Sequence, residues 1–578
     1  MTDVAVRPET TAPRGGRVRG SNPDLVTLAF RFAIGAAALV AVILRFCPTT
    51  ALWLDEAQSV AIARLPLSGA GTTMWDGLRQ DGSPPLYYLL LHGWISVFGT
   101  GTSAVRAMSA VLNLVAVAPL YVLGRRTVGE RAARIAILLY LTSPFAFYFA
   151  SETRMYSLVV LLTALGGVAL EATLRRPSAR TVAALAVCSG LLALTHYWCF
   201  YLLLTAAGWL AALALRRGSG ARGPVDAAGP AEREAVDASA RTAIDLGAPA
   251  STAVTASSTA AKPAATRSPA RPALLGLLGI VAGVVVFAPW LPNFRYQMQH
   301  TGTPWGEPAS FAAVAHAYGE WAGGPSTEGR LLLLIVTALV AFGMAGTALD
   351  GRRISLDLHG REPGRTLFFL STITLLVAVA AGKVVGNAWA DRYTATAFVP
   401  FLLVVGLGAT LLTDQRVFRG VLVLAVLLGL YGGAADMLKT RTQAGQAGSI
   451  LARVSHPGDV LLVCPDQLGP GLSRTIPSWL KVHVVPTYAG PDRVDWVDYE
   501  KRNSRANANA IVARTLAEAG PGHQVFFAGS AAYRTYETLC TAVETGLLTK
   551  RPHYTQVMRQ ADPDQSFENF ILADFRPR

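Results

Sequence analysis

Long apolar runs recur along most of this chain, and short polar segments separate them. An apolar stretch of about 20 residues is long enough to cross a bilayer as a helix. Runs that approach this length occur near residues 25–47, 103–124, 132–150, 155–174, 180–196, 198–215, 273–292, 330–349, 366–386, 393–412 and 419–437. The pattern predicts a polytopic α-helical membrane protein with about 11 transmembrane helices within residues 25–437.

One further apolar run, residues 84–98, is short and begins with Pro84-Pro85. Lys and Arg collect in cytoplasmic loops, so the loop charges indicate whether this run crosses. If it does not cross, the cytoplasmic segments hold 22 Lys and Arg, and the outer loops before residue 437 hold five. We therefore expect 84–98 to be a juxtamembrane helix. The N-terminus is then cytoplasmic and the C-terminal part lies outside.

The polar segments divide the chain further. Residues 1–24 carry four arginines and little that could pack, so we expect a disordered cytoplasmic tail. Residues 218–272 consist largely of Ala, Ser, Thr, Pro and Gly, which is typical of a disordered linker. The predicted topology places this linker in the cytoplasm. The first outer loop is expected at 48–102 and a later one at 293–329.

Residues 438–578 have a different pattern, in which short apolar runs alternate with amphipathic stretches. The predicted elements are strands at 459–463 and 524–528 and helices at 506–519 and 533–547. This alternation favours a small extracytoplasmic α/β domain. In that oxidising compartment Cys464 and Cys540 could form a disulfide.

Composition agrees with a membrane protein and narrows its partners. Hydrophobic residues make up 52% of the chain, charged residues 15%, and the mean hydropathy is +0.37. The net charge of +14 lies mainly in loops between apolar runs. It therefore reflects membrane orientation and not a nucleic-acid-binding surface. The abundance of Ala, Arg and Gly suggests an actinobacterial source.

The candidate chemistry lies at the outer ends of the predicted spans. Asp55 and Glu56 follow the first span directly. Further ionisable and aromatic residues on the predicted outer side are Asp81, His92, Glu152, Arg154, His196, Arg295, Tyr296, Lys383, Asp391, Arg392 and Tyr393. Each alone is typical of an interfacial anchor. Together they supply carboxylates for proton transfer and cations for a phosphate.

Several short motifs resemble membrane glycosyltransferases of the GT-C superfamily. Within it the chain looks like the family-39 enzymes, which are related to protein O-mannosyltransferases and to the aminoarabinose transferases of lipid A. The motifs are Leu54-Asp55-Glu56-Ala57, Asp81-Gly82-Ser83-Pro84-Pro85-Leu86-Tyr87-Tyr88, Ala104-Val105-Arg106, Ser143-Pro144, Thr153-Arg154-Met155-Tyr156 and Asp391-Arg392-Tyr393. The resemblance covers about residues 25–437, although the long linker within this range and the C-terminal domain after it depart from the general pattern of the family.

The resemblance implies transfer of a sugar from a polyprenyl-phosphate donor to an acceptor hydroxyl, usually with inversion. Asp55 matches the general base of the first loop, and Glu56 would orient Asp55, the acceptor or an ion. The phosphate would meet Arg392, Arg154 and Lys383, because fixed cations stabilise a leaving phosphate. Other candidate site residues are His196, His92, Asp81, Tyr156 and Tyr393, although Tyr156 and Tyr393 also suit an aromatic membrane belt.

A cofactor is not required by these motifs, and a divalent metal ion stays an open alternative. Asp55 and Glu56 could supply ligands together with His92 or His196. The only Asp-x-Asp pattern, Asp562-Pro563-Asp564, lies far along the sequence in the C-terminal part. Metal dependence is therefore not predicted in either direction.

The expected partners are a polyprenyl-phosphate sugar, a polysaccharide, glycolipid or protein acceptor, and the lipid bilayer. The expected location is the plasma membrane. One alternative is a transporter or flippase of a lipid-linked precursor, which would place ionisable residues near the bilayer midplane. Another is a non-catalytic envelope scaffold. A cluster of Asp55 with Arg154 or Arg392 would favour the enzyme over both.

Overall fold

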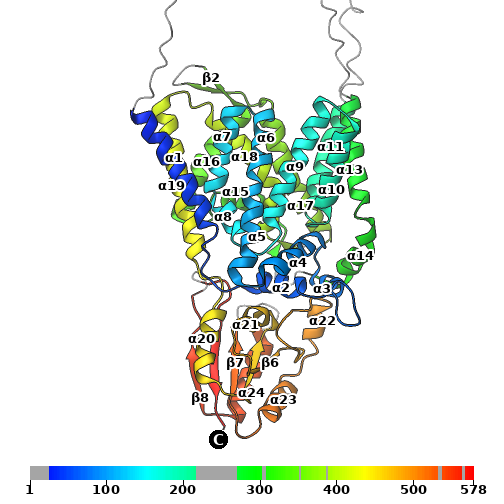
Figure 1. The fold of residues 1–578 in the computed structure, drawn as a ribbon, viewed down its shortest axis with the longest axis vertical. Helices are drawn as coiled ribbons and strands as arrows, with labels where there is room; N and C mark the ends of the chain where they lie inside the picture. Colours follow the sequence, from blue (N-terminus) through cyan, green and yellow to red (C-terminus); the bar gives the residue numbers. More distant parts are fainter. Residues whose placement is uncertain are drawn as a thin grey trace, which may run out of the picture.

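A bundle of long helices stands on a smaller α/β part in the computed structural model (Figure 1). The structure describes residues 25–215, 270–302, 307–349, 353–385, 388–530, 537–562 and 566–577. The predicted tail at 1–24 and the linker up to residue 269 lie outside these residues. The predicted linker end at 272 is slightly late, because a helix already begins at Ala270.

Each apolar run predicted to span the membrane forms one helix or two or three consecutive helical segments. They are α1 (Leu25–Leu44), α5 (Thr102–Val115) with α6 (Val117–Thr127), α7 (Glu130–Thr142) with α8 (Pro144–Ala150), α9 (Tyr156–Arg175), α10 (Ala179–Ala193), α11 (Cys199–Leu215), α13 (Ala270–Val285) with η2 (Ala288–Trp290) and α14 (Leu291–His300), α16 (Thr327–Ala345), α17 (Gly364–Val385), η3 (Asp391–Thr394) with α18 (Ala395–Ala409), and α19 (Gln415–Leu438). Among the described residues eight helices are long and apolar enough to cross a membrane. The pair α7 and α8, bent by 58°, makes a ninth candidate, and α10 and α11 are shorter apolar helices. The predicted polytopic helical fold is confirmed.

Local sequence explains the bend between α7 and α8 and the close contact between α16 and α18. Ser143 ends α7, and its hydroxyl accepts a hydrogen bond from Ala146 N, while Pro144 starts the new helix. The helices α16 and α18 touch backbone to backbone. A Cβ atom at Gly408 would lie 1.7 Å from the carbonyl oxygen of Leu339, so this crossing requires glycine.

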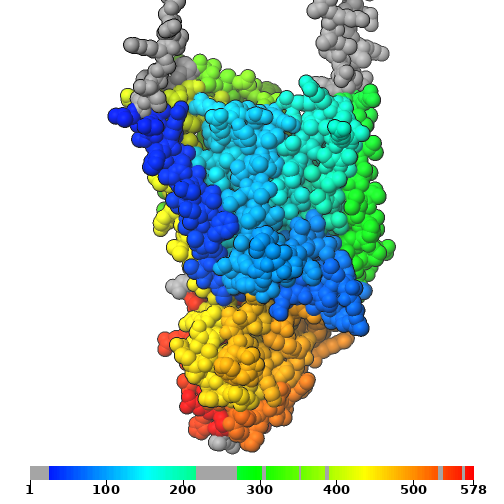
Figure 2. Space-filling model, in the orientation of Figure 1, coloured from blue at the N-terminus to red at the C-terminus, as the bar shows by residue number. Residues whose placement is uncertain are grey.

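Three short helices of the first loop cover one end of the bundle (Figures 1 and 2). They are α2 (Leu54–Ala63), α3 (Met74–Asp81) and α4 (Leu86–Phe98). The helix α4 is the expected juxtamembrane helix and lies beside α2 and α5. The later loop adds α15 (Phe311–Trp321) and a short strand, β1 (Glu307–Pro308), which pairs with β4 (Ala388–Trp389). Another hairpin, β2 (Gly346–Ala348) with β3 (Ile354–Leu356), lies at the opposite end.

The C-terminal part is an α/β unit around a five-stranded sheet in the order β6-β5-β7-β9-β8. Its strands are β5 (Val460–Cys464), β6 (Lys481–Val484), β7 (Val525–Gly529), β8 (Tyr554–Met558) and β9 (Ile571–Phe575). Its helices are α20 (Ala444–Val454), α21 (Gly469–Ser473), α22 (Tyr499–Asn503), α23 (Ala508–Ala519) and α24 (Glu537–Lys550), with η4 (Asp466–Leu468) before α21. The strands β5, β6 and β7 are parallel, and β9 is antiparallel to both of its neighbours. The central strands β5 and β7 are completely buried, which explains their uninterrupted apolar sequence.

Two sequence predictions for this part are confirmed. Both predicted strands are present, and a disulfide joins Cys464 to Cys540. The predicted helix from 533 is described from Glu537 onward, since residues 531–536 lie outside the described chain. The start of α1, the end of α11 and the start of α13 lie at the end of the bundle opposite the C-terminal part (Figure 1).

Candidate active site

Helix α2 carries the acidic pair and lies between the helical bundle and the C-terminal part (Figure 2). Asp55 and Glu56 occupy its first turn, where the helix dipole favours negative charge. Leu54 N donates a 2.6 Å hydrogen bond to the carboxyl group of Glu568 in the C-terminal part. Asp55 is partly exposed, whereas Glu56 is completely buried. The two neighbouring carboxylates therefore have different environments.

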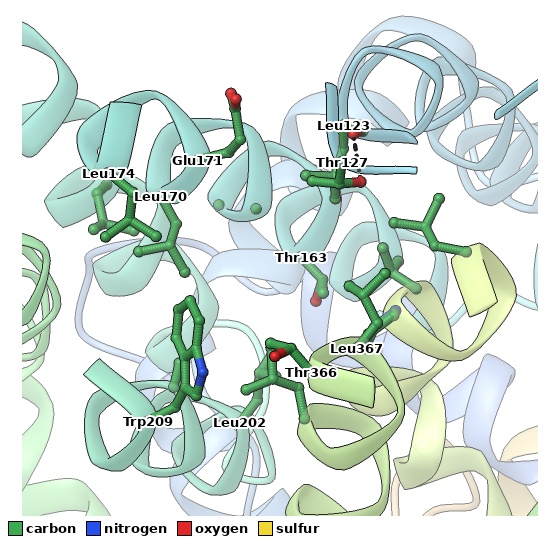
Figure 3. Close-up of a pocket in the computed structure, with 18 of the residues that line it drawn as sticks. Leu123, Thr127, Thr163, Leu170, Glu171, Leu174, Leu202, Trp209, Thr366 and Leu367 are labelled. Atoms are coloured by element: carbon green, nitrogen blue, oxygen red, sulfur yellow. Dashed lines mark hydrogen bonds between the residues drawn. The ribbon is translucent and has the colours of Figure 1, made fainter. Parts of the chain in front are cut away.

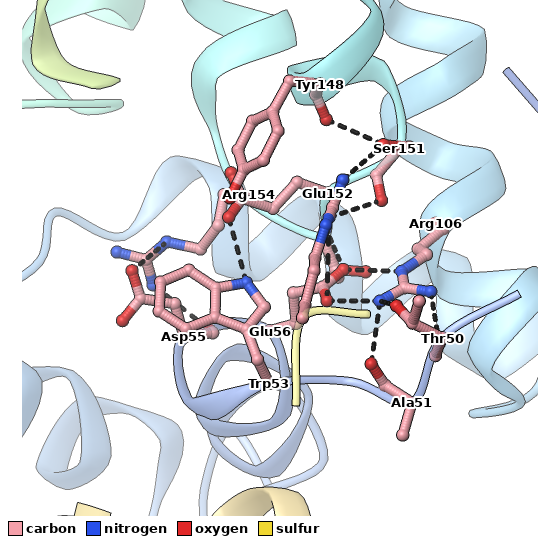
Figure 4. Close-up of polar contacts among 12 residues, drawn as sticks. Thr50, Ala51, Trp53, Asp55, Glu56, Arg106, Tyr148, Ser151, Glu152 and Arg154 are labelled. Carbon is pink, nitrogen blue, oxygen red and sulfur yellow. Dashed lines mark hydrogen bonds and ion pairs between the residues drawn. The ribbon is translucent and has the colours of Figure 1, made fainter. Parts of the chain in front are cut away.

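Asp55 faces two arginines from distant parts of the chain (Figure 4 shows Arg154). Its Oδ2 atom lies 3.9 Å from Nε of Arg154 and 3.5 Å from Nη2 of Arg392. Arg154 also donates hydrogen bonds to Ser59 at 3.0 Å and to the Tyr88 hydroxyl at 3.3 Å. Burial works against the charge of Arg154, but Asp55 together with Tyr88, Tyr156 and Asp81 outweighs burial and raises the pKa of Arg154 above the usual range. The structure thus brings Asp55, Arg154 and Arg392 together.

This ion-paired group keeps hydrogen-bonding capacity. Within the described part of the chain, neither Oδ2 of Asp55 nor Nε of Arg154 has a hydrogen-bond partner. Asp55 can therefore accept a proton, and Arg154 can still donate to an oxygen. In such a group the carboxylate can deprotonate a hydroxyl, and the two neighbouring guanidinium groups can hold a phosphate.

Glu56 forms a buried two-point ion pair with Arg106 from α5 (Figure 4). The Nε–Oε1 distance is 2.8 Å and the Nη2–Oε2 distance is 2.6 Å. Thr153 N donates a further hydrogen bond to Oε1 at 2.9 Å, and Nη1 of Arg441 lies 3.9 Å from Oε2. Burial opposes ionisation of Glu56, but Arg106 together with Arg441 and the Thr153 N–H outweighs burial and keeps the pKa of Glu56 below the usual value. Because its oxygens are occupied, Glu56 suits a positioning role better than a reactive one.

The aromatic candidates form a wall beside the two arginines. The His196 ring lies 4.9 Å from Tyr393 and 5.9 Å from Tyr156, measured between ring centroids. The Arg392 guanidinium lies 5.7 Å from the centre of the Tyr393 ring. Burial, with Arg154 and Arg392 nearby, lowers the pKa of His196 to about 3. His196 is therefore neutral at pH 7, and its Nδ1 accepts from Trp198 N at 3.2 Å.

Three other sequence candidates do not reach Asp55. Asp81 accepts hydrogen bonds from Gln58, Ser83 and Tyr88. The Tyr88 hydroxyl also accepts from Arg154 and so links Asp81 to the site. Nδ1 of His92 lies 2.7 Å from the carbonyl oxygen of Ala63. Lys383 is exposed, and its ammonium lies 5.1 Å from the centre of the Phe311 ring. The side chain of Lys383 lies over the start of α15, and its expected contact with the phosphate stays a prediction.

Sequence reasoning missed three residues of the cluster. Glu152 is buried and accepts a 3.1 Å hydrogen bond from Trp53 Nε1, and burial raises its pKa to about 7. Its place between two spans was visible, but no motif gave it a role. Arg441 and Glu568 lie beyond the last span, and only the tertiary fold brings them to α2. No sequence signal would have found them.

Asp55 and Glu56 with His92 or His196, the ligands considered for an open metal alternative, do not form a ligand group among the described residues. Glu56 is engaged by Arg106, and His92 contacts a backbone carbonyl. Another group, His316 and Glu320 on α15 with Asp391 on η3, has ligand atoms within 4.8 Å of one another. These three side chains could hold a divalent cation, and Asp391 directly precedes Arg392 in the sequence. They are half-exposed or exposed.

An apolar cavity of about 400 Å³ lies within the bundle (Figure 3). It is lined by α6, α9, α10, α11, α13, α17 and α18, with leucines and Trp209 forming much of the wall. Thr127, Glu171 and Arg175 also line it. The cavity shares no residue with the Asp55 cluster, and its walls suit a hydrocarbon chain.

Comparisons with known proteins agree with this architecture. Residues 82–223 match the profile of a family described as dolichyl-phosphate-mannose-protein mannosyltransferase. The fold is similar to ArnT from Cupriavidus metallidurans in the apo state, with 14% identity and a TM-score of 0.50, covering 95% of this chain and 98% of that one. It is equally similar to ArnT bound to undecaprenyl phosphate, with 12% identity and a TM-score of 0.50, covering 94% and 98%.

A more distant similarity is to an oligosaccharyltransferase from Archaeoglobus fulgidus, with 12% identity, a TM-score of 0.44, and coverage of 92% of this chain and 73% of that one. No curated protein sequence matches the chain. The family profile and the ArnT-like fold confirm the expected similarity to membrane glycosyltransferases of the GT-C superfamily.

Proposed function

We propose that this protein is a glycosyltransferase that moves a sugar from a polyprenyl-phosphate donor to a hydroxyl group of a cell-envelope or secreted acceptor. The observation that carries the proposal is the cluster of Asp55 with Arg154 and Arg392 at one end of the bundle. It combines a proton acceptor with two cations, which are the groups that displacement of a phosphate by an alcohol requires.

The proposed reaction is one displacement at the anomeric carbon. The acceptor oxygen forms a bond to that carbon, and the bond from carbon to phosphate oxygen breaks with its electron pair leaving on the phosphate. The hydroxyl proton passes to Asp55. Negative charge grows on the phosphate as the bond breaks, and Arg154 and Arg392 stabilise it.

The two arginines have a second effect in this scheme. Both guanidinium groups pair with Asp55 Oδ2, at 3.9 and 3.5 Å. A bound phosphate competes for the same guanidinium groups, because charge-assisted bonds to phosphate are strong. Donor binding would thus release Oδ2 of Asp55 to accept the proton. The base becomes free when the donor is in place.

We place this site on the outer face of the plasma membrane. The support is the excess of basic residues in the segments assigned to the cytoplasm, 22 against five. The start of α1, the end of α11 and the start of α13 lie opposite α2 and the C-terminal part, as this orientation requires (Figure 1). The N-terminus and the linker at 218–272 are then cytoplasmic.

The donor and acceptor classes follow from the same reasoning. ArnT, whose fold this chain shares, has been solved with undecaprenyl phosphate. A polyprenyl-phosphate-linked mannose or arabinose is the donor class we infer. The acceptor is a polysaccharide, glycolipid or protein with a free hydroxyl. The clustering of Asp55 with both arginines at one end favours this enzyme over a transporter or a scaffold.

The test uses the purified full-length protein in detergent or nanodiscs. It is incubated with radiolabelled polyprenyl-phosphate-mannose or polyprenyl-phosphate-arabinose and an envelope extract as acceptor. We expect one donor to lose its label to the acceptor, with release of polyprenyl phosphate. Retention of label on both donors, while a control transferase in the same membranes remains active, would contradict the proposal.

A further inference from the structure

The first turn of α2 is completed by a residue that lies 514 positions later in the chain. The first N–H groups of a helix lack partners within the helix. Trp53 precedes α2 and offers no side-chain cap. Instead Leu54 N donates a 2.6 Å hydrogen bond to Oε1 of Glu568. Glu568 is 2% exposed, so this contact is sheltered from water.

Glu568 is itself held firmly. Its backbone N donates to the carbonyl oxygen of Arg441 at 3.0 Å, and its carbonyl oxygen accepts from Gln443 N at 3.0 Å. The adjacent Phe567 ring stacks on Trp53, with 6.1 Å between ring centroids. Residues 566–570 and 441–443 thus form a paired segment against the start of α2.

The other end of the acidic turn is also tied to the C-terminal part. Gln58 donates to the carbonyl oxygen of Val494 at 2.9 Å, and Val494 N donates to Gln58 Oε1 at 2.9 Å. The C-terminal part therefore holds α2 on both sides of Asp55. A side chain in the first turn cannot move independently of these two contacts.

We propose that Glu568 is a positioning residue, which fixes the first turn of α2 and with it the Asp55 carboxylate. The inference rests on the proposed function for its catalytic consequence, and on the Leu54–Glu568 contact for its structural one. The C-terminal part is then a component of the active site and not a separate module. Glu568 acts through α2 and does not touch the reacting atoms.

The charge state of Glu568 agrees with this role. Burial, with Asp55 and Glu56 nearby, raises the pKa of Glu568 to about 8. At neutral pH the group is therefore mostly protonated and adds little negative charge beside Asp55. A neutral amide of the same shape can replace it as an acceptor of the Leu54 N–H. Glutamine is thus the conservative variant and leucine the disruptive one.

The experiment compares Glu568→Gln, Glu568→Leu and Asp459→Leu in the full-length protein. Asp459 is the matched control, since it is also 2% exposed and accepts hydrogen bonds from backbone N–H groups, those of His456 and Gln524. It lies in the C-terminal part without contacting α2. Amide hydrogen exchange of residues 54–58 is measured by mass spectrometry, together with kcat and KM for the donor that wild type uses.

We expect Glu568→Leu to speed exchange in residues 54–58 and to lower kcat, each by about 10-fold, as for a lost helix cap, with little change in KM. Glu568→Gln should retain both wild-type values. Asp459→Leu should leave exchange at 54–58 unchanged. Wild-type exchange and kcat in Glu568→Leu would overturn the inference, as would equal effects from Asp459→Leu. If wild type uses neither donor, the proposed function fails, and the exchange data alone decide whether Glu568 positions α2.

Discussion

Glu56 and Arg106 form a completely buried ion pair through two parallel contacts, of 2.8 and 2.6 Å. Removing one partner of such a pair leaves an uncompensated charge, which costs about 3–5 kcal/mol. We expect Arg106→Ala to lower the unfolding temperature strongly and to abolish activity. The double variant Glu56→Leu with Arg106→Met should recover much of the stability. Thermal unfolding in detergent measures both, and an unchanged midpoint in Arg106→Ala would contradict the prediction.

Asp55→Asn should abolish turnover while the protein stays folded. The change keeps the side-chain shape and removes the proton acceptor, and a general base contributes roughly 10²–10⁴ in rate. Asp76→Asn is the matched control. Asp76 is an exposed aspartate of the same loop, and its carboxylate accepts a hydrogen bond from Thr73 N in the capping box of α3. Initial rates with saturating donor separate the two. Near-wild-type rates in Asp55→Asn would show that Asp55 is only a helix-start residue.

Arg154→Ala and Arg392→Ala should lower kcat with the lipid-phosphate donor more than they change use of the acceptor. Both guanidinium groups meet at Asp55, where the phosphate is proposed to bind. Arg→Lys at either position should recover little, because lysine offers a point charge without the planar fork. Steady-state kinetics with varied donor and acceptor, and unfolding temperatures beside them, give the measurement.

The control for these arginines is Arg79→Ala. Arg79 lies on α3 in the same loop, with its guanidinium 3.6 Å from the centre of the Tyr296 ring. A general loss of surface charge would lower activity in Arg79→Ala as well. If Arg154→Ala, Arg392→Ala and both Lys variants turn over like wild type, these cations are headgroup anchors and the phosphate binds elsewhere.

Stability should depend on pH through Glu152. Burial raises its pKa in the folded protein from the usual 4.5 to about 7. Between pH 4.5 and 7 the folded state therefore holds a proton that the unfolded state has released, so stability falls as pH rises through this window. Glu152→Gln should reduce this slope by at most about 1.4 kcal/mol per pH unit, while the contribution of Glu568, whose pKa is also raised, remains. Unfolding temperatures at pH 5, 6 and 7 would reveal it, and equal slopes in both proteins would refute the assignment.

The orientation can be tested in intact cells. We expect a cysteine introduced at Ser504 to react with a membrane-impermeant maleimide and one at Ser257 to react only after lysis. The reason is the 22 against five distribution of basic residues. The native Cys464 and Cys540 are joined in a disulfide and do not compete for label. The opposite labelling pattern would invert the topology.

The sequence predicted the helices well because each span must satisfy its own backbone within a continuous apolar run. The predicted topology also placed Asp55, Arg154 and Arg392 at one end, and the structure brings them within 4 Å. The same rule could not place Lys383. Helix-end position fixes the side of the membrane but not the direction in the plane, and Lys383 lies over Phe311 instead.

Contacts between the bundle and the C-terminal part could not be predicted in the same way. Arg441 lies near the start of the C-terminal part and Glu568 near residue 570. They reach α2 together because an isolated β-bridge joins Thr442 to Glu568. Neither residue belongs to a local motif. The 58° bend after Thr142 was signalled by Ser143-Pro144, but the direction of α8 depends on its packing against α5 and α19.

The hydrogen bond between Leu54 and Glu568 also constrains how the protein is made. Leu54 leaves the ribosome 514 residues before Glu568. The spans can enter the bilayer as they emerge, but the start of α2 must wait for Glu568 before it reaches its final form. A chain terminated before Glu568 would then sit in the membrane without this support for Asp55. Synthesis of the C-terminal part and ordering of the proposed catalytic turn are thereby linked in one contact.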